Sequence, residues 1–406
     1  MKVLTVFGTR PEAIKLAPVV RALEARAADS GVHSVVCVTA QHRQMLDQVL
    51  DLFELRPDYD LAVMEENQTL AGVAAAVLAR LEPVLRAVRP DWVLVQGDTT
   101  TVAATALAAY YAGARVGHVE AGLRTGDKWR PFPEEINRRV AGVVADRHFA
   151  PTARAQANLL REGVAAGQIV VTGNPVLDAL RRVVDLPPPE DARAILAQTG
   201  LDGAAPQAAA SAPRRLVLVT AHRRESFGAP LEAVCAALRD LAARYAGAVQ
   251  VVYAVHPNPH VREPAYRLLD GVPNVTLTPP LTYSALAHLM KRAALVLTDS
   301  GGIQEEAPGL GVPVLVLRDV TERPEAVEAG TVRLVGTDRG RIVAAASQLL
   351  DDPAAYARMA RAVNPYGDGH AAPRIVAALL GEPVEPFRPE ASRTDVPCAA
   401  AYGGSA

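Results

Sequence analysis

Residues that could do chemistry follow most of the apolar, strand-like runs of this 406-residue sequence. In an open parallel sheet, ligands bind beyond the carboxyl ends of the strands, so residues in these places are candidates for a site. The segments are GTRPE (8–12), GDTTT (97–101), EAGLR (120–124), AHRRE (221–225), HPNP (256–259) and DSGG (299–302). Their distribution predicts that both halves of the chain contribute to a ligand site.

Three carboxylates of the first half stand at predicted strand ends or helix starts: Asp98, Glu120 and Glu134. A positioned carboxylate can take or deliver a proton during a reaction. Taken alone, Asp98 could instead cap the threonine-rich helix that follows it. Glu134, which follows the rigid segment 131–133, could simply be an acidic residue favoured by the helix dipole. The residues by themselves leave both interpretations open.

The DSGG run of the second half opens a predicted helix. Its glycines let a ligand approach the backbone, and the free N–H groups there suit a phosphate. The helix dipole contributes only about 0.3–1 kcal/mol, and a hydrogen bond to a charged group about 1.5–3 kcal/mol. A diphosphate would therefore also need cationic side chains, for which Arg10, Lys15 and Arg323 are candidates. An ordinary glycine turn is the competing interpretation.

Two carboxylates, Glu305 and Glu306, follow the glycines by about one helical turn. A carboxylate in this place could accept hydrogen bonds from both hydroxyls of a ribose. The alternative is a solvated helix face, which remains open for Glu305, whereas Glu306 is the better candidate for a ligand contact.

Other classes of protein are disfavoured by composition and by missing motifs. No GxGxxG follows the first strand, which argues against a reaction that oxidises with NAD and then reduces, and the nine histidines lack metal-ligand spacing. We therefore expect no cofactor and no metal. The formal charge of −2 offers no footprint for nucleic acid. No run approaches the roughly 20 apolar residues of a membrane span, and the first residues resemble a strand more than a signal peptide. A cytoplasmic location follows as an expectation.

The three cysteines, Cys37, Cys235 and Cys398, are odd in number, far apart and in no CxxC pair. This pattern argues against a disulfide framework and against a structural zinc site. Cys37 and Cys235 lie in apolar runs, so we expect them to be core residues.

Short β-rich runs alternate with longer helical stretches along the chain, which predicts α/β architecture with parallel sheets. The predicted strands are 2–7, 34–39, 92–96, 115–119, 148–150, 169–172, 216–220, 249–255, 275–277, 295–298, 313–317 and 331–335. The predicted helices are 12–28, 43–53, 69–88, 101–111, 134–145, 153–162, 230–245, 260–269, 283–292, 303–309, 338–350, 353–361 and 371–380. A proline- and alanine-rich stretch, 184–214, interrupts the alternation and predicts a linker between two domains.

These motifs together resemble the non-hydrolysing UDP-N-acetylglucosamine 2-epimerases of bacteria. The similar stretches cover residues 1 to about 370 in the family's order. They are FGTRPEAIKLAPVV, VTAQHRQMLDQVL, PDYDL, GDTTT, GHVEAGLRTGD, PFPEEINR, TAHRRESFG, VHPNP, LTDSGGIQEEAP, PVLVLRDVTERPEAVEAGT, VGTD and NPYGDG. The resemblance implies a GT-B-like fold, in which two Rossmann-like doubly wound domains face each other across a cleft.

The resemblance also implies a domain layout. An N-terminal Rossmann-like domain, 1–183, carries the carboxylates and is completed by a C-terminal helix at about 366–382. The linker 184–214 leads to a C-terminal UDP-binding domain, 215–365, and 383–406 is expected to be a disordered tail.

The activity implied by the resemblance is epimerisation at C2 of UDP-N-acetylglucosamine to UDP-N-acetylmannosamine. UDP leaves from C1 while a base removes the C2 proton, a 2-acetamidoglucal forms, and UDP adds back after the proton returns on the other face. By motif, Asp98, Glu120 and Glu134 would handle protons, and His222 would help UDP leave. The substrate-binding residues would be Arg10, Lys15, Leu281, Leu286, Ser300, Gly301, Gly302, Glu306 and Arg323.

Some members of the family are regulated by a second substrate molecule, and Gln41, Gln44, Arg223 and His256 match the positions concerned. Asn67 and Gln96 depart from the pattern of regulated members, which carry Arg and more commonly His there. We therefore expect weak or absent activation. The resemblance further implies a homodimer.

Other functions remain to be weighed against this one. They are an epimerase of a related UDP-2,3-diacetamido sugar, a hydrolysing variant, a GT-B glycosyltransferase and a non-catalytic UDP-sugar sensor. A transferase would have little use for three carboxylates, and a sensor could lose them.

Overall fold

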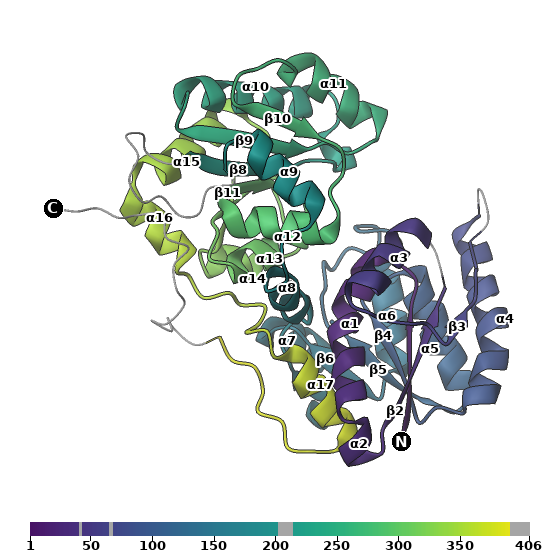
Figure 1. The fold of residues 1–406 in the computed structure, drawn as a ribbon. Helices are drawn as coiled ribbons and strands as arrows, with labels where there is room; N and C mark the ends of the chain where they lie inside the picture. Colours follow the sequence, from purple (N-terminus) through teal and green to yellow (C-terminus); the bar gives the residue numbers. More distant parts are fainter. Residues whose placement is uncertain (40–42, 65–67, 202–213, 390–406) are drawn as a thin grey trace. The chain divides into compact units, whose positions relative to one another are not determined.

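The computed structural model describes residues 1–39, 43–64, 68–201 and 214–389, with the backbone alone for 43–45 (Figure 1). The described chain forms two compact units. The first comprises Met1–Arg181 and Tyr366–Arg388, and the second is built mainly from Arg182–Pro365.

The sheet of the first unit has seven strands in the order β3-β2-β1-β4-β5-β6-β7, and every pair is parallel. The strands are β1 Lys2–Phe7, β2 His33–Val38, β3 Tyr59–Asp60, β4 Trp92–Gln96, β5 Arg115–Val119, β6 Arg147–Ala150 and β7 Ile169–Val171. The order reverses between β1 and β4, which is where doubly wound sheets place their ligands. The GTRPE and GDTTT segments follow these two strands.

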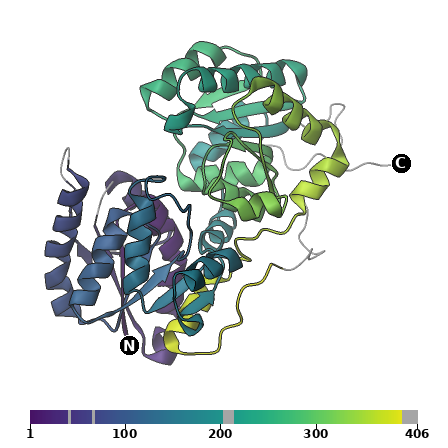
Figure 2. The same ribbon diagram turned by 180° about the vertical axis from the view of Figure 1, so that it is seen from behind.

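The helices of the first unit cover its sheet (Figures 1 and 2). They are α1 Arg10–Ala25, α2 Ala27–Ser30, α3 Arg43–Leu52, α4 Leu70–Val88, α5 Thr100–Tyr111, α6 Glu134–Val144, α7 Ala153–Arg161, α8 Val176–Val184 and α17 Ala371–Leu380. The last of these, α17, packs against α1 (Figure 1). Asp178 of α8 accepts hydrogen bonds from the first two N–H groups of α17, at 3.1 and 2.8 Å. The C-terminal helix is thus fixed within the first unit.

The second unit repeats this architecture with six parallel strands in the order β10-β9-β8-β11-β12-β13. The strands are β8 Arg215–Thr220, β9 Val249–Ala254, β10 Val275–Thr278, β11 Ala293–Thr298, β12 Val314–Val316 and β13 Val332–Leu334. The helices are α9 Glu190–Gln198, α10 Ala229–Arg244, α11 Pro259–Leu269, α12 Tyr283–Arg292, α13 Ile303–Gly309, α14 Pro324–Glu328, α15 Arg339–Asp351 and α16 Pro353–Ala360. Here the order reverses between β8 and β11, the strands that precede AHRRE and DSGG.

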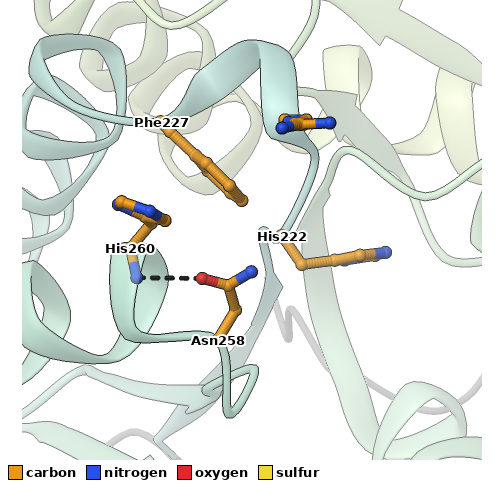
Figure 3. Close-up of a pocket in the computed structure, with 5 residues that line it drawn as sticks. His222, Phe227, Asn258 and His260 are labelled. Atoms are coloured by element: carbon orange, nitrogen blue, oxygen red, sulfur yellow. Dashed lines mark hydrogen bonds between the residues drawn. The ribbon is translucent and has the colours of Figure 1, made fainter. Parts of the chain in front are cut away.

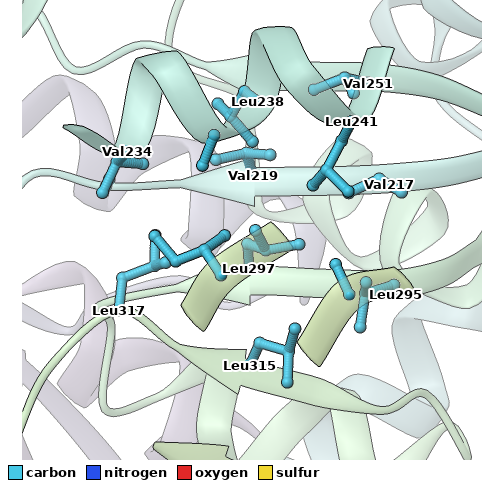
Figure 4. Packing of buried hydrophobic residues seen from close by; sticks show 14 of the residues in the cluster. Val217, Val219, Val234, Leu238, Leu241, Val251, Leu295, Leu297, Leu315 and Leu317 are labelled. Atoms are coloured by element: carbon cyan, nitrogen blue, oxygen red, sulfur yellow. The ribbon is translucent and has the colours of Figure 1, made fainter. Parts of the chain in front are cut away.

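The core of the second unit lies between its sheet and the α10 layer (Figure 4). Val219 of β8 and Leu297 of β11 face Leu238 of α10, and all three are fully buried. Burying one such aliphatic side chain contributes about 1.5–3 kcal/mol. Long runs of these residues hold the strands, and therefore the polar segments that follow them, in fixed positions.

The predicted α/β class with two doubly wound parallel-sheet domains is confirmed. Every predicted strand is present, with ends within two residues of those expected. Cys37 and Cys235 are core residues as predicted, and burial raises the pKa of each thiol to about 12. In the parts of the chain that the structure describes, no helix has both the length and the apolar character of a membrane span.

The stretch 184–214 is not a linker throughout, because α9 lies within it. Ile195 of this helix is buried, and Asp191 accepts a 2.9 Å hydrogen bond from the Thr282 hydroxyl just before α12. The proline triplet that suggested a linker separates α8 from α9, and Pro189 directly precedes the first residue of α9. Residues 202–213 of this stretch lie outside the described residues.

The prediction of a disordered tail is wrong for its first residues, 383–388. Phe387 is buried, and its N–H donates a 2.8 Å hydrogen bond to the Val171 carbonyl at the end of β7. The Arg374 guanidinium lies over its ring at 5.7 Å. One aromatic side chain with a backbone hydrogen bond is enough to order this proline-rich segment. Residues 390–406 lie outside the described residues.

Candidate active site

Glu120 lies just beyond the carboxyl end of β5 and is held from three sides. It ion-pairs with Lys15 of α1. The same carboxylate oxygen, Oε2, accepts hydrogen bonds of 3.0 Å from Gln96 at the end of β4 and of 3.0 Å from Asn174 after β7. Its backbone φ is +62°, a left-handed conformation that is uncommon for a residue with a side chain. The chain accepts backbone strain here, which is typical of functional sites.

Asp98 follows β4 and has a different cationic partner. Arg138 of α6 binds its Oδ2, and the Asp98 side chain is 27% exposed. The same guanidinium donates to Glu135, at 3.3 Å, and to the Leu123 carbonyl, at 3.3 Å. Sequence reasoning named Asp98 but neither Arg138 nor Glu135, since an Arg three residues after a Glu in a helix looks like an ordinary surface pair.

Glu134 is the first residue of α6 and is partly buried. Its Oε2 is buried and has no hydrogen-bond partner among the described residues. Two cis peptide bonds, before Pro131 and Pro133, lead into the helix. The three predicted carboxylates therefore have three different environments. Two are paired with cations, whereas Glu134 has no cationic partner in the part of the chain that the structure describes.

Arg10 begins α1, and the residue that organises this turn is Glu12. The buried Glu12 carboxylate accepts hydrogen bonds from the N–H groups of Gly8, at 2.7 Å, and Thr9, at 2.8 Å. It also accepts one of 2.6 Å from the Thr99 hydroxyl, so it joins the GTRPE and GDTTT turns. Burial raises the pKa of Glu12 in spite of these hydrogen bonds. The Thr-x-x-Glu spacing of a capping box was the signal for this role.

His118 contacts the backbone of the turn that carries Asp98. Its Nε2 lies 2.7 Å from the Gly97 carbonyl oxygen. Burial lowers the pKa of His118 to about 4, so the ring is neutral near pH 7. Its neighbour in the sheet, His148, is buried too, and burial lowers its pKa to about 4.

In the second unit, His222 follows β8 and is oriented by a buried aspartate. Asp299 lies 3.1 Å from His222 Nδ1 and accepts 2.7 Å hydrogen bonds from the N–H groups of His222 and Arg223. Burial alone would raise the pKa of Asp299, but the hydrogen bonds and the charge of His222 outweigh it, and the pKa is lowered. The aspartate thus holds the His222 ring in one orientation, which suits a group that meets a phosphate or delivers a proton. Sequence reasoning placed Asp299 only in the glycine run and missed this role.

His256, predicted to take part in regulation, stacks on the His222 ring with 5.6 Å between centroids. Burial and the neighbouring His222 lower its pKa. The Arg223 side chain is exposed. Gln41 lies outside the described residues, as does the side chain of Gln44, so their part in a regulatory site stays a prediction.

A pocket of about 390 Å³ opens beside His222 (Figure 3). Its other lining residues are Arg224, Phe227, Asn258 and His260. The Phe227 and His260 rings stack at 5.4 Å, and Asn258 caps α11 by accepting a hydrogen bond from the His260 N–H at 2.9 Å.

Ser300, Gly301 and Gly302 connect β11 to α13, as predicted. A Cβ on Gly301 would lie 3.3 Å from the guanidinium carbon of Arg323, so a larger residue would require the guanidinium to shift. Arg323 donates a 2.8 Å hydrogen bond to Glu305 Oε1. Glu305 is 1% exposed, so it does not belong to a solvated helix face, and it binds Arg323.

Glu306 is buried and lies beside the Tyr283 hydroxyl. Burial and the Glu306 carboxylate together raise the pKa of Tyr283 well above its usual value. Leu281 precedes α12, Leu286 lies within it, and both are partly buried. The structure thus groups the predicted residues into two sets. Asp98, Glu120, Lys15 and Arg10 lie at the carboxyl edge of the first sheet, with Glu134 at the start of the neighbouring α6. The remaining predicted site residues that the structure describes belong to the second unit.

Two doubly wound units with polar residues at the carboxyl ends of their strands define a GT-B-like α/β protein. Comparison with known proteins shows which family within this class the chain resembles. A family model for UDP-N-acetylglucosamine 2-epimerase matches residues 24–380. The UDP-N-acetylglucosamine 2-epimerase of Yersinia pestis is 54% identical over 95% of this chain and 100% of its own length. That of Escherichia coli K12 is 55% identical over 93% of this chain and 98% of its own.

Solved structures agree with these sequence comparisons. The UDP-GlcNAc 2-epimerase of Neisseria meningitidis, bound to UDP-GlcNAc, superimposes with a TM-score of 0.84 at 46% identity and covers 94% of this chain and 100% of its own. A putative UDP-N-acetylglucosamine 2-epimerase of Listeria monocytogenes gives a TM-score of 0.84 at 46% identity, covering 93% and 95%. The chain belongs to the UDP-N-acetylglucosamine 2-epimerase family, and it is an enzyme of the isomerase class.

Proposed function

We propose that the protein interconverts UDP-N-acetylglucosamine and UDP-N-acetylmannosamine by elimination and re-addition of UDP. The observation that carries this proposal is the near full-length similarity to epimerases of this name, together with the Neisseria structure that holds UDP-GlcNAc. The charged cluster at Asp98 and Glu120 supports the proposed chemistry, because its carboxylates lie at the carboxyl edge of a doubly wound sheet, where such sheets bind ligands.

The C2 hydrogen of the sugar is not adjacent to a carbonyl, so simple deprotonation there is too difficult. In the proposed reaction a carboxylate removes the C2 proton, the C1–O bond breaks, and the electron pair leaves with UDP. The product of this step is 2-acetamidoglucal. A second acid group then protonates C2 on the opposite face, and UDP attacks C1. Each positioned proton transfer contributes about 10²–10⁴ to the rate.

Asp98, Glu120 and Glu134 are the proposed proton-handling residues. His222, held by Asp299, would meet the diphosphate and stabilise the charge on departing UDP. Charge-assisted hydrogen bonds from Arg10 and Lys15 would bind the phosphates and sugar. Ser300, Gly301, Gly302 and Arg323 would bind phosphate, Glu306 the ribose, and Leu281 and Leu286 the uracil.

The enzyme is proposed to work in the cytoplasm as a homodimer, without metal or nicotinamide cofactor. Weak or absent activation by UDP-GlcNAc is part of the proposal. Gln96, which stands where histidine is more common, here donates its amide to Glu120. A strongly sigmoidal rate curve that becomes hyperbolic in His256→Ala would contradict this point.

The test is a proton NMR time course of UDP-GlcNAc with the purified protein in D₂O, without added metal or NAD. Appearance of UDP-ManNAc carrying deuterium at C2 is the expected result. Tight UDP binding without exchange would contradict the proposal and favour a UDP-2,3-diacetamido sugar or a transferase reaction. Both are then tested by substituting the sugar or adding acceptors.

A further inference from the structure

A buried charge cluster extends from Asp98 into the first unit. Arg138 is its centre, with only 8% of its side chain exposed. One terminal nitrogen binds Asp98, and the other lies 3.3 Å from Glu135 Oε2 and 3.3 Å from the Leu123 carbonyl. The guanidinium therefore joins the turn after β4, the segment after β5 and the start of α6.

Glu135 is fully buried, and its charge is compensated. Arg138 and Arg139 lie at 3.3 Å from its two oxygens. The N–H groups of Thr125 and Gly126 donate to it at 3.1 and 3.2 Å. Four donors therefore surround this buried carboxylate, and it fixes the guanidinium through the terminal nitrogen that does not bind Asp98.

The cluster brings two carboxylates, Asp98 and Glu135, against two guanidinium groups, Arg138 and the more exposed Arg139. Arg138 is the group that touches both carboxylates, so it links the position of Asp98 to that of the fully buried Glu135.

Glu134 provides the contrast. It is the neighbour of Glu135 in the sequence, but within the described chain its buried Oε2 has no hydrogen-bond partner. The two carboxylates at the start of α6 are thus held differently, since Glu135 is fixed by four donors and Glu134 Oε2 by none in the part of the chain that the structure describes.

We infer that Arg138 is a positioning residue that holds the Asp98 carboxylate in place, so that Asp98 begins the reaction as a proton acceptor. This inference rests on the proposed epimerisation and assigns a starting role to one of its three carboxylates. Glu135 supports it by fixing Arg138. Neither Arg138 nor Glu135 needs to touch the substrate.

Other ionisable groups adjoin Asp98 and could affect its pH dependence. Glu12 of α1 binds Thr99, the next residue, and His118 of β5 lies under Gly97. Glu134, Glu135 and Arg139 approach from α6, and the Lys15–Glu120 pair lies beyond the end of β5. A test must therefore change Arg138 while leaving all of these in place.

Arg124 supplies the matched control. Its side chain is also 8% exposed, it also donates to the Leu123 carbonyl, at 2.7 Å, and it also binds a carboxylate, Glu162, at 2.7 Å. Glu162 has no part in the proposed reaction. Arg138→Gln and Arg124→Gln thus remove equally buried guanidinium groups from the same neighbourhood.

The experiment measures kcat and KM for UDP-GlcNAc between pH 4.5 and 9 in the wild type, both glutamine variants and Arg138→Lys. In Arg138→Gln we expect the acid limb of kcat/KM to move to higher pH by about 1 unit, since a neighbouring cation is lost. Plateau kcat should fall about tenfold, with KM within about twofold. Arg124→Gln should keep the wild-type acid limb of kcat/KM. Arg138→Lys should keep this limb but lose kcat, because lysine retains the positive charge without the planar, two-pronged guanidinium.

Several outcomes would overturn the inference. The inference fails if the acid limb of kcat/KM does not move in Arg138→Gln, and also if it moves by the same amount in Arg124→Gln. If Arg138→Gln does not fold, Arg138→Lys decides, because a moved limb in a variant that keeps the charge contradicts the proposed role. If the wild type exchanges no C2 proton, the proposed function and this inference both fail. If the wild type is active but the acid limb of kcat/KM stays in place in Arg138→Gln, only this inference fails.

Discussion

The two units have the same sheet architecture but hold their polar residues in different ways. In the first, carboxylates are paired with side-chain cations: Glu120 with Lys15 and Asp98 with Arg138. In the second, Asp299 is held by two backbone N–H groups and an imidazole, and Gly301 packs against the Arg323 guanidinium. The first arrangement suits proton transfer, and the second suits an anionic ligand. The fold alone determines neither, because both follow from the short segments after the strands.

Glu120→Gln is the strongest test of this division of labour. The variant loses a carboxylate proposed to handle protons and leaves Lys15 beside a neutral amide, so kcat should fall by about 10²–10⁴. Affinity for UDP, measured by calorimetry, should change little, because most of the proposed UDP contacts come from the second unit. A tenfold or larger loss of UDP affinity would show that the two functions are not separated.

Asp299→Asn tests the second unit in the same way. The amide cannot hold the His222 ring and the two backbone N–H groups as the carboxylate does, so we expect kcat to fall by about 10–100-fold. His222→Ala measures the full contribution of the imidazole. Adding Asp299→Asn to that variant should cost little more in kcat, since the aspartate is proposed to act through the histidine. Strictly multiplicative losses would indicate that Asp299 has an independent role.

The buried histidines make the first unit sensitive to acid. The pKa of His118 is lowered to about 4 in the fold, against about 6.5 when unfolded. Between these values the unfolded chain binds more protons, so stability falls as the pH falls below 6.5. From pH 7 to pH 5 the loss is about 2 kcal/mol, or roughly 30-fold in the unfolding equilibrium. Urea unfolding at pH 7 and pH 5 measures this loss in the wild type and in His118→Gln, whose side chain at position 118 cannot titrate. If the unfolding free energies of the two proteins depend on pH in the same way, His118 is not the cause.

Gly301→Ala is expected to have the smallest effect and to fall on the second unit alone. The added methyl group would lie 3.3 Å from the Arg323 guanidinium carbon and displace it. UDP affinity should drop about tenfold, in line with a modest overpacking cost. Gly340→Ala in α15 is the matched control, and its UDP affinity should be unchanged. Unaltered UDP binding in Gly301→Ala would exclude this packing from the phosphate site.

The strands and the residues after them could be predicted from the sequence because apolar runs and glycine turns are local signals. The partners of those residues could not. Arg138 reaches Asp98 across 40 positions, and Asn174 reaches Glu120 across 54, distances over which spacing carries no information. Helix α9 was missed because its flanking prolines also suit a linker. Phe387 was missed because one buried ring among polar residues leaves no periodic pattern.

The packing of α17 on α1 has a consequence for how the protein is made. Strands β1 to β7 leave the ribosome early, but the helix and the Phe387 segment that complete the first unit follow the whole second unit. At ~5–20 residues per second, the wait between Arg181 and Arg388 is about 10–40 s. During translation, the nascent first unit exposes the apolar surface of α1 that α17 later covers. The second unit, continuous in sequence, can close first, so the order of completion is the reverse of the order of synthesis.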